Sequence, residues 1–256
     1  MRAFIPRDLW IVICNKVIYL FILALLTIGQ PVFGQSGGAG APSLSRVVID
    51  PGHGGEDSGV TGPSGWPESE LALDMARQFK AALEQEMDVQ VYLTRDDDQT
   101  LSLTERTALA NALKADLFIS FHAAGAFSKD RTGFRVYYQD YRIQPGLSVE
   151  QTSEVQTGLV QEWDVAQAQH VTASHKLAEE LDQALSETLR SSSWGPIGLP
   201  LTILAGAGQP AVLVEVGTLT NAEEERRLKT KGYRDALTTA LLRGVRVWRH
   251  WYESRN

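Results

Sequence analysis

The sequence of 256 residues contains a single cysteine, Cys14, which lies near the amino terminus. The chain that follows it has no thiol for disulfide formation, nucleophilic catalysis or metal binding. A disulfide framework and a cysteine-based catalytic site are therefore excluded there. Any metal site in that part of the chain must use histidine and carboxylate side chains.

The sequence also lacks an excess of positive charge, with 24 Lys and Arg against 31 Asp and Glu and a net charge of -7. Binding to nucleic acid through its phosphates needs clustered Lys and Arg on one face, and no such basic stripe is present. The glycine-rich segment 52–59 (GHGGEDSG) has the spacing of neither phosphate-binding glycine fingerprint. We expect neither nucleic acid nor a nucleotide as ligand.

No repeated module is visible, and a chain of this length with 43% hydrophobic residues suits one α/β domain plus accessory segments. An apolar stretch, Val17 to Ile28, follows basic residues and is short for a membrane span. We interpret residues 1–34 as a signal peptide or, alternatively, an uncleaved anchor that would be the only membrane contact. Residues 35–45 (QSGGAGAPSLS) are typical of a flexible linker. The prediction is an exported, monomeric protein of the periplasm or cell envelope, with its folded domain at residues 46–256.

Strand and helix patterns alternate along this domain. Leu71, Met75, Phe79 and Leu83 recur every four residues and mark the buried face of one helix, and Ser102 with Glu105 forms a capping box at the start of another. The predicted strands are 47–49, 89–94, 116–121, 133–138 and 211–214, and the predicted helices are 68–86, one from 102, 171–189 and 233–248. This alternation predicts a single α/β domain with a mostly parallel, twisted sheet covered by helices on both faces.

Polar residues occur where three of these strands end. His53 follows the first strand, His122 closes the third, and Glu215 closes the late strand. The carboxyl ends of parallel strands form the edge at which open α/β sheets bind ligands. We therefore expect these three side chains to converge at that edge.

Glu68 completes the set, because the helical period puts it on the buried face while Glu70 points to solvent. An unpaired carboxylate in an apolar setting costs several kcal/mol, and a divalent cation would remove that cost. Two histidines and one glutamate form a known catalytic zinc set that leaves a fourth position open. We predict zinc bound by His53, Glu68 and His122, with Glu215 as the general acid–base group.

Each residue alone has an ordinary structural explanation. His53 could be a surface residue of a glycine-rich loop, His122 a core histidine, and Glu68 a partner of the helix dipole. It is their combination that favours a metal site. The remaining histidines and the acidic run are interpreted as packed or solvated residues: His170, His175, His250 and Asp96–Asp98.

Five blocks, VVIDPGHGGEDSGVTGPSGWPESELAL, LTRDDDQTLSLTERTALAN, ADLFISFHA, GFRVYY and PAVLVEVGTLTNAEEERRL, resemble successive blocks of the zinc-dependent N-acetylmuramoyl-L-alanine amidases. The resemblance extends from about Arg46 to the carboxyl terminus. It implies a hydrolase that cleaves the amide between N-acetylmuramic acid and L-alanine and so releases stem peptides from peptidoglycan. Matching motif by motif gives His53, Glu68 and His122 as metal ligands and Glu215 as the catalytic glutamate.

The sequence departs from the family pattern at Ala124, where asparagine is frequent, and at Thr218, where an aromatic residue is common. We expect both positions beside the catalytic site. Residues 139–169 are longer than in some relatives, and in certain cell-division amidases an inserted helix here covers the zinc until a partner displaces it. The segment is therefore interpreted as a regulatory or cleft-lining insertion on which an activator protein would act.

Three competing functions remain open from the sequence. The first is a zinc peptidase that cleaves within the stem peptide, and the second is a non-catalytic relative that only binds peptidoglycan. The third is an exported zinc esterase or deacetylase. The four intact residues disfavour the second, and the family blocks disfavour the third.

Overall fold

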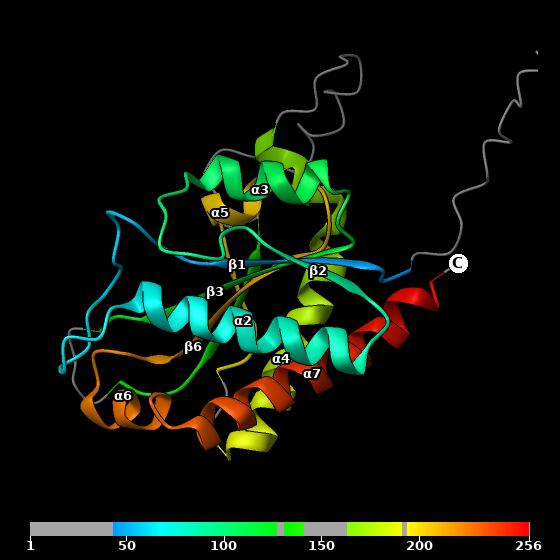
Figure 1. The fold of residues 1–256 in the computed structure, drawn as a ribbon. Helices are drawn as coiled ribbons and strands as arrows, with labels where there is room; N and C mark the ends of the chain where they lie inside the picture. The colour runs from blue at the N-terminus through cyan, green and yellow to red at the C-terminus, as the bar shows by residue number, and fades with distance from the viewer. Residues whose placement is uncertain (1–42, 127–130, 141–162, 191–193, 256) are drawn as a thin grey trace, which may run out of the picture. The chain divides into compact units, whose positions relative to one another are not determined.

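A six-stranded sheet runs through the residues described by the computed structural model, which are 43–126, 131–140, 163–190 and 194–255 (Figure 1). Its strands are β1 (Arg46–Pro51), β2 (Gln90–Leu93), β3 (Leu117–Ala124), β4 (Arg135–Gln139), β5 (Ile197–Leu199) and β6 (Ala211–Thr218). The spatial order is β2-β1-β3-β6-β4-β5. The first four in this order are mutually parallel, and β4 runs antiparallel to β6 with β5 parallel to β4. The predicted α/β class with a mostly parallel sheet is confirmed.

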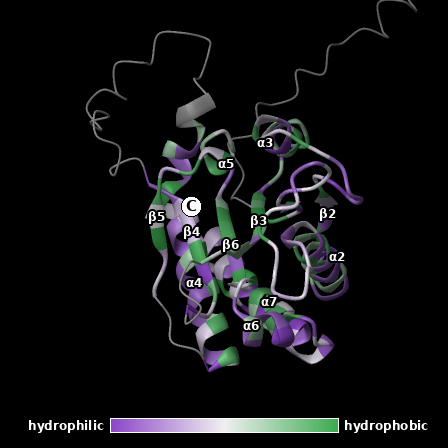
Figure 2. Cartoon of the chain, turned by 90° about the vertical axis from the view of Figure 1, so that its left-hand side faces the viewer, coloured by the Kyte–Doolittle hydropathy of each residue, from purple (hydrophilic) through white to green (hydrophobic). Residues whose placement is uncertain are grey.

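Helices cover both faces of the sheet, with α2, α4 and α7 on one side and α3 and α5 on the other (Figure 1). The helices are α2 (Glu68–Glu86), α3 (Leu103–Ala112), α4 (Val171–Leu189), α5 (Thr202–Ala205), α6 (Ala222–Leu228) and α7 (Lys231–Glu253), and a 3-10 helix, η3 (Trp163–His170), precedes α4. Figure 2 shows apolar segments of the strands enclosed between the two helical layers. Two hydrophobic cores therefore lie on opposite faces of one sheet.

Alternation along the strands explains the two cores. Val47 and Ile49 of β1 belong to the larger core with α2, α4 and α7, whereas Val48 belongs to the smaller core with α3 and α5. In β3 the same alternation puts Ile119 in the larger core and Phe118 in the smaller one. Strands buried on both faces read as continuous apolar runs, which is why the sequence pattern located them.

Three features of the fold were not predicted. The short elements β5, α5 and α6 have too few residues to show a period, and the reversal of β4 and β5 leaves no mark on apolar patterning. The third difference concerns strand ends, since β3 continues past His122 to Ala124 and β6 continues past Glu215 to Thr218. His122 and Glu215 therefore lie inside their strands, two and three residues before the last.

The domain begins earlier than the predicted start at residue 46. Leu44 is 1% exposed within the larger core, and its backbone N–H donates to a carboxylate oxygen of Glu253 at 3.0 Å. The end of the predicted linker, residues 35–45, thus belongs to the fold. The predicted leader, residues 1–34, lies outside the described residues.

The predicted insertion, residues 139–169, begins and ends in regular structure. Gln139 closes β4, its side chain accepts a hydrogen bond from the backbone N–H of Leu201, and residues 163–169 belong to η3. Residues 141–162 lie outside the described part of the chain. Within the part that is described, no helix combines the length and apolar character needed to cross a bilayer.

Candidate metal centre

His53 lies in the loop that leaves β1, at the carboxyl edge of the sheet. Its φ of 59° is in the left-handed region, which non-glycine residues seldom adopt. The preceding residue, Gly52, sits against the imidazole of His122, so a Cβ atom at position 52 would overlap that ring. The glycine therefore allows the β1 loop to approach β3 closely enough for the two histidines to meet.

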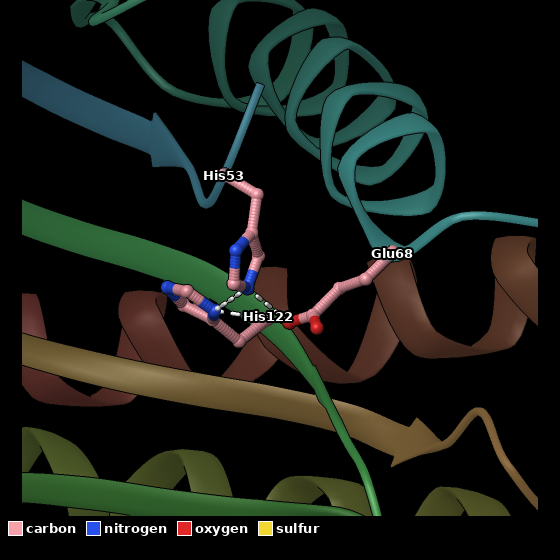
Figure 3. Close-up of side chains that lie close together, drawn as sticks. All are labelled: His53, Glu68 and His122. Carbon is pink, nitrogen blue, oxygen red and sulfur yellow. Dashed lines mark hydrogen bonds and ion pairs between the residues drawn. The ribbon is translucent and has the colours of Figure 1, made fainter. Parts of the chain in front are cut away.

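The side chains of His53, Glu68 and His122 converge from three different elements (Figure 3). The distance between Nε2 of His53 and Oε1 of Glu68 is 3.0 Å, and Nδ1 of His122 lies 3.0 Å from the same oxygen. The two ring nitrogens are 3.1 Å apart. Ligands about 2.0–2.1 Å from a tetrahedral zinc ion would be separated by about 3.3 Å, so these donor atoms fit such an ion closely.

Glu68 is the most enclosed member of this triangle, with a side chain 3% exposed. Its Oε1 also accepts the backbone N–H of Ala123 at 2.9 Å, and its Oε2 accepts the backbone N–H of Val60 at 3.1 Å. Glu70, two residues further along α2, is exposed, as the helical period predicts. The carboxylate at position 68 is thus fixed by contacts from both sides rather than serving only the helix dipole.

Asp57 orients His53 and was not identified from the sequence. Nδ1 of His53 lies 2.8 Å from Oδ2 of Asp57, within hydrogen-bond distance. A ring that donates its Nδ1–H to Asp57 and has lost the proton on Nε2 would direct the Nε2 lone pair to the centre of the triangle, which is the tautomer that binds a metal ion. The signal that could have revealed this residue is a carboxylate four positions after a candidate ligand in the same loop.

The electrostatics of the triangle keep Glu68 ionised. Burial alone raises the pKa of its carboxyl, but hydrogen bonds with His122 and His53 outweigh burial and hold the pKa well below its usual value. Burial lowers the pKa of His53, while contacts with Glu68 and Asp57 raise it by more, so the net shift is upward. A buried anion faced by two imidazoles is a favourable environment for a cation.

Two buried arginines hold the backbone of the β1 loop. Arg95 donates to the carbonyl oxygens of Pro51 at 3.0 Å and Gly52 at 2.7 Å. Arg106, on α3, donates to the carbonyl of His53 at 2.7 Å and pairs with the fully buried Asp50 at 2.8 Å. Successive carbonyls of the loop are therefore fixed by charged donors, which restrict where His53 can lie.

Glu215 lies one strand away from the triangle. It pairs directly with His122 of β3 on one side and with Arg135 of β4 on the other, so the three residues form a row across the sheet. The hydroxyl of Tyr137 donates to Oε2 of Glu215 at 3.0 Å, and Nη1 of Arg135 lies 3.7 Å from the same oxygen. Burial, followed by the charge of Glu215, raises the pKa of Tyr137, which keeps that hydroxyl protonated as a donor.

The remaining sequence-based expectations have different outcomes. Ala124 and Thr218 pair with each other and are 3% and 0% exposed, so neither offers open surface beside the site. Their expected place beside the catalytic site stays a prediction. The other histidines and the acidic run are not members of the three-residue group: His170, His175, His250 and Asp96–Asp98.

Comparison with known proteins agrees with this geometry. Residues 47–247 match the sequence profile of the N-acetylmuramoyl-L-alanine amidase family. The chain is 28% identical to the amidase AmiC of Escherichia coli O6:H1 over 229 residues, which is 84% of this chain and 55% of AmiC. It is also 28% identical to AmiA of Escherichia coli K12, covering 82% of this chain and 78% of AmiA.

A solved structure shares the fold. The catalytic domain of the amidase CwlV from Bacillus (Paenibacillus) polymyxa var. colistinus superposes with a TM-score of 0.65 and 28% identity, over 80% of this chain and 98% of that domain. The chain thus corresponds to a whole catalytic domain, and to little more than half of the longer AmiC. The profile match spans most of the described sheet and all four candidate residues. We conclude that this chain belongs to the N-acetylmuramoyl-L-alanine amidase family.

Proposed function

We propose that this protein hydrolyses the amide bond between N-acetylmuramic acid and L-alanine in peptidoglycan, with zinc held by His53, Glu68 and His122. The observation that carries the proposal is the triangle of donor atoms 3.0–3.1 Å apart at the sheet edge, beside a strand-paired glutamate. Family membership supports the choice of bond, because the relatives are named for it. Two imidazoles and a carboxylate support the choice of zinc.

In this mechanism, His53, Glu68 and His122 would hold the zinc ion, which when bound would supply a Lewis acid for the scissile carbonyl and the attacking water. Glu215 accepts a proton from the attacking water and returns it to the nitrogen of L-alanine as the C–N bond breaks. The products are a lactyl carboxylate on the sugar and a free amine on the stem peptide. Tyr137 orients the glutamate by donating to its Oε2.

Mass spectrometry of peptidoglycan digested by the purified protein tests the proposal. We expect intact stem peptides with a free L-alanine amine, lost on chelation and recovered when zinc is added back. Glu215→Gln removes the proton acceptor with little change of shape, and activity should fall about 10²–10⁴-fold while zinc content stays at one ion per chain. Glu70→Gln, which changes an exposed residue of α2, is the matched control and should behave as the unmodified protein.

Product analysis also separates the alternatives. Fragments cut within the stem peptide would replace this proposal with a zinc peptidase. A zinc-loaded, folded protein that binds peptidoglycan and releases nothing would instead indicate a non-catalytic relative or a protein that needs an activator.

The need for an activator protein would depend on residues 139–169, whose central part lies outside the described residues. We propose that this segment restrains activity until a partner protein engages it, and that residues 1–34 direct export to the cell envelope. Deleting Ser148 to Leu159 should then raise the rate of stem-peptide release by the purified protein. Unchanged or lower activity in a folded deletion variant would argue against autoinhibition.

A further inference from the structure

Trp194 is the most exposed large hydrophobic residue in the described part of the chain. Its side chain is 73% exposed, compared with 47% for Leu103, the next in order. A single exposed apolar side chain is common on protein surfaces and has no meaning by itself. The position of Trp194 relative to Glu215 is what distinguishes it.

The indole lies over the guanidinium of Arg135, with Cζ 5.5 Å from the ring centroid. Arg135 is 3% exposed and occupies the cross-strand row that also contains Glu215 and His122. Trp194 is therefore connected to the catalytic glutamate through one intervening side chain. It lies on the β4 side of Glu215, away from Glu68 and α2.

A buried cation under one face of the indole restricts the orientation of the ring. Nη1 of Arg135 has no hydrogen-bond partner among the described residues and lies 3.7 Å from Oε2 of Glu215, so the contact between these two side chains is one of charge. The high exposure of Trp194 leaves the opposite face of the indole open to solvent. The indole therefore presents one open aromatic face at the margin of the site.

We propose that Trp194, seated on Arg135, is a stacking platform for a sugar ring of the glycan strand. The inference rests on the proposed function, since the amide to be cleaved hangs from a sugar that must lie within reach of Glu215. A pyranose ring has an apolar C–H face and a polar rim, which a flat indole complements. A carboxylate of the stem peptide would need an exposed guanidinium to bind at this position. Arg135 is buried, and the indole of Trp194 lies over it.

The test measures binding of a peptide-free oligosaccharide of alternating N-acetylglucosamine and N-acetylmuramic acid, by titration calorimetry. Trp194→Ala should weaken binding about five- to tenfold, whereas Trp194→Phe, which keeps an aromatic face, should retain most of it. Tyr92→Ala is the matched control, because Tyr92 is an exposed aromatic residue on β2 at the opposite edge of the sheet. The Tyr92→Ala variant should bind the oligosaccharide as tightly as the unmodified protein.

Kinetics on glycan strands with stem peptides gives a second readout. Loss of the platform should raise KM by a similar factor with kcat largely retained, because stacking acts on substrate binding rather than on the reacting atoms. The binding assay needs no turnover, so a failure of the amidase proposal and a failure of the platform are distinguishable. The platform is overturned if Trp194→Ala binds the oligosaccharide as tightly as the unmodified protein, or if the unmodified protein does not bind it.

Discussion

Asp57 lies within hydrogen-bond distance of Nδ1 of His53, so in the proposed zinc site it would select the nitrogen of His53 that binds the metal. Replacing it by alanine removes the acceptor of the Nδ1–H at 2.8 Å and frees the ring to rotate or change tautomer. We expect zinc affinity to fall about 10–100-fold, as for other partners of metal-bound histidines. Competition with a chromophoric chelator measures the change.

Glu56→Ala is the control for this variant, since it removes an exposed carboxylate from the adjacent position. A reduction of zinc affinity by both substitutions would show that general loss of negative charge, rather than orientation of His53, is responsible. Equal affinity of the Asp57 variant and the unmodified protein would contradict the assigned role.

Single residues were predictable where a local period or a strand end located them. Glu68 follows from the helical face it shares with Leu71, and His53 from the turn after an apolar strand. Asp57, Arg95 and Arg106 were missed because their roles depend on contacts made only in the folded chain. Arg106 reaches the carbonyl of His53 across 53 positions, and no sequence pattern encodes that pairing.

The ion pair between Arg106 and Asp50 joins α3 to β1. Both side chains are buried, at 4% and 0% exposure, so Arg106→Ala removes the paired cation from an interior carboxylate that keeps only hydrogen bonds from the hydroxyls of Thr94 and Ser120. We expect the free energy of unfolding to fall by about 3–5 kcal/mol. Urea denaturation followed by circular dichroism measures this loss.

Arg243→Ala supplies the comparison, because its partner Glu187 forms an exposed pair with it on helices α7 and α4. That substitution should cost less than about 1 kcal/mol. If the two substitutions reduced the free energy of unfolding equally, the buried pair of Arg106 and Asp50 would stabilise the fold no more than a surface ion pair does.

Elements with enough residues to display a period were predicted closely. The helix expected over 68–86 is α2, and the capping box of Ser102 and Glu105 begins α3. The direction of a strand, by contrast, depends on how the chain returns to the sheet. The pattern predicted a strand over 133–138, where β4 lies, but it gave no indication that this strand runs antiparallel to β6.

At the scale of the whole domain, the segment before β1 is attached to the last helix. Leu44 is 1% exposed in the larger core and its N–H donates to Glu253 near the end of α7. Leu44→Ala in the full chain should reduce the free energy of unfolding by about 2–5 kcal/mol. Chemical denaturation of the full-length variant measures the effect.

Leu103→Ala is the counterpart, because this leucine on α3 is 47% exposed and little area is lost from the core. Its unfolding free energy should stay within about 0.5 kcal/mol of the unmodified value. If Leu44→Ala were equally neutral, the domain would begin at residue 46, where the composition of the linker places it.

The layered arrangement of the domain was predictable from two physical rules, whereas the reversed direction of β4 and β5 was not. Strands covered on both faces must be continuously apolar, and their carboxyl ends must share an edge, so His53, His122 and Glu215 were placed together before any contact was known. The row from His122 through Glu215 to Arg135 could not be foreseen. It depends on strand register, and a shift of one residue would turn Glu215 to the other face.

The left-handed backbone at His53 has an evolutionary consequence. An L-residue at a φ of 59° costs roughly 1–2 kcal/mol relative to glycine, so the fold would be more stable with glycine at this position. Under the proposed role of His53 as a metal ligand, histidine persists only while selection for metal binding exceeds selection for stability. In lineages that have abandoned catalysis, position 53 should therefore be among the first of the four candidate residues to drift, and glycine or asparagine should replace it.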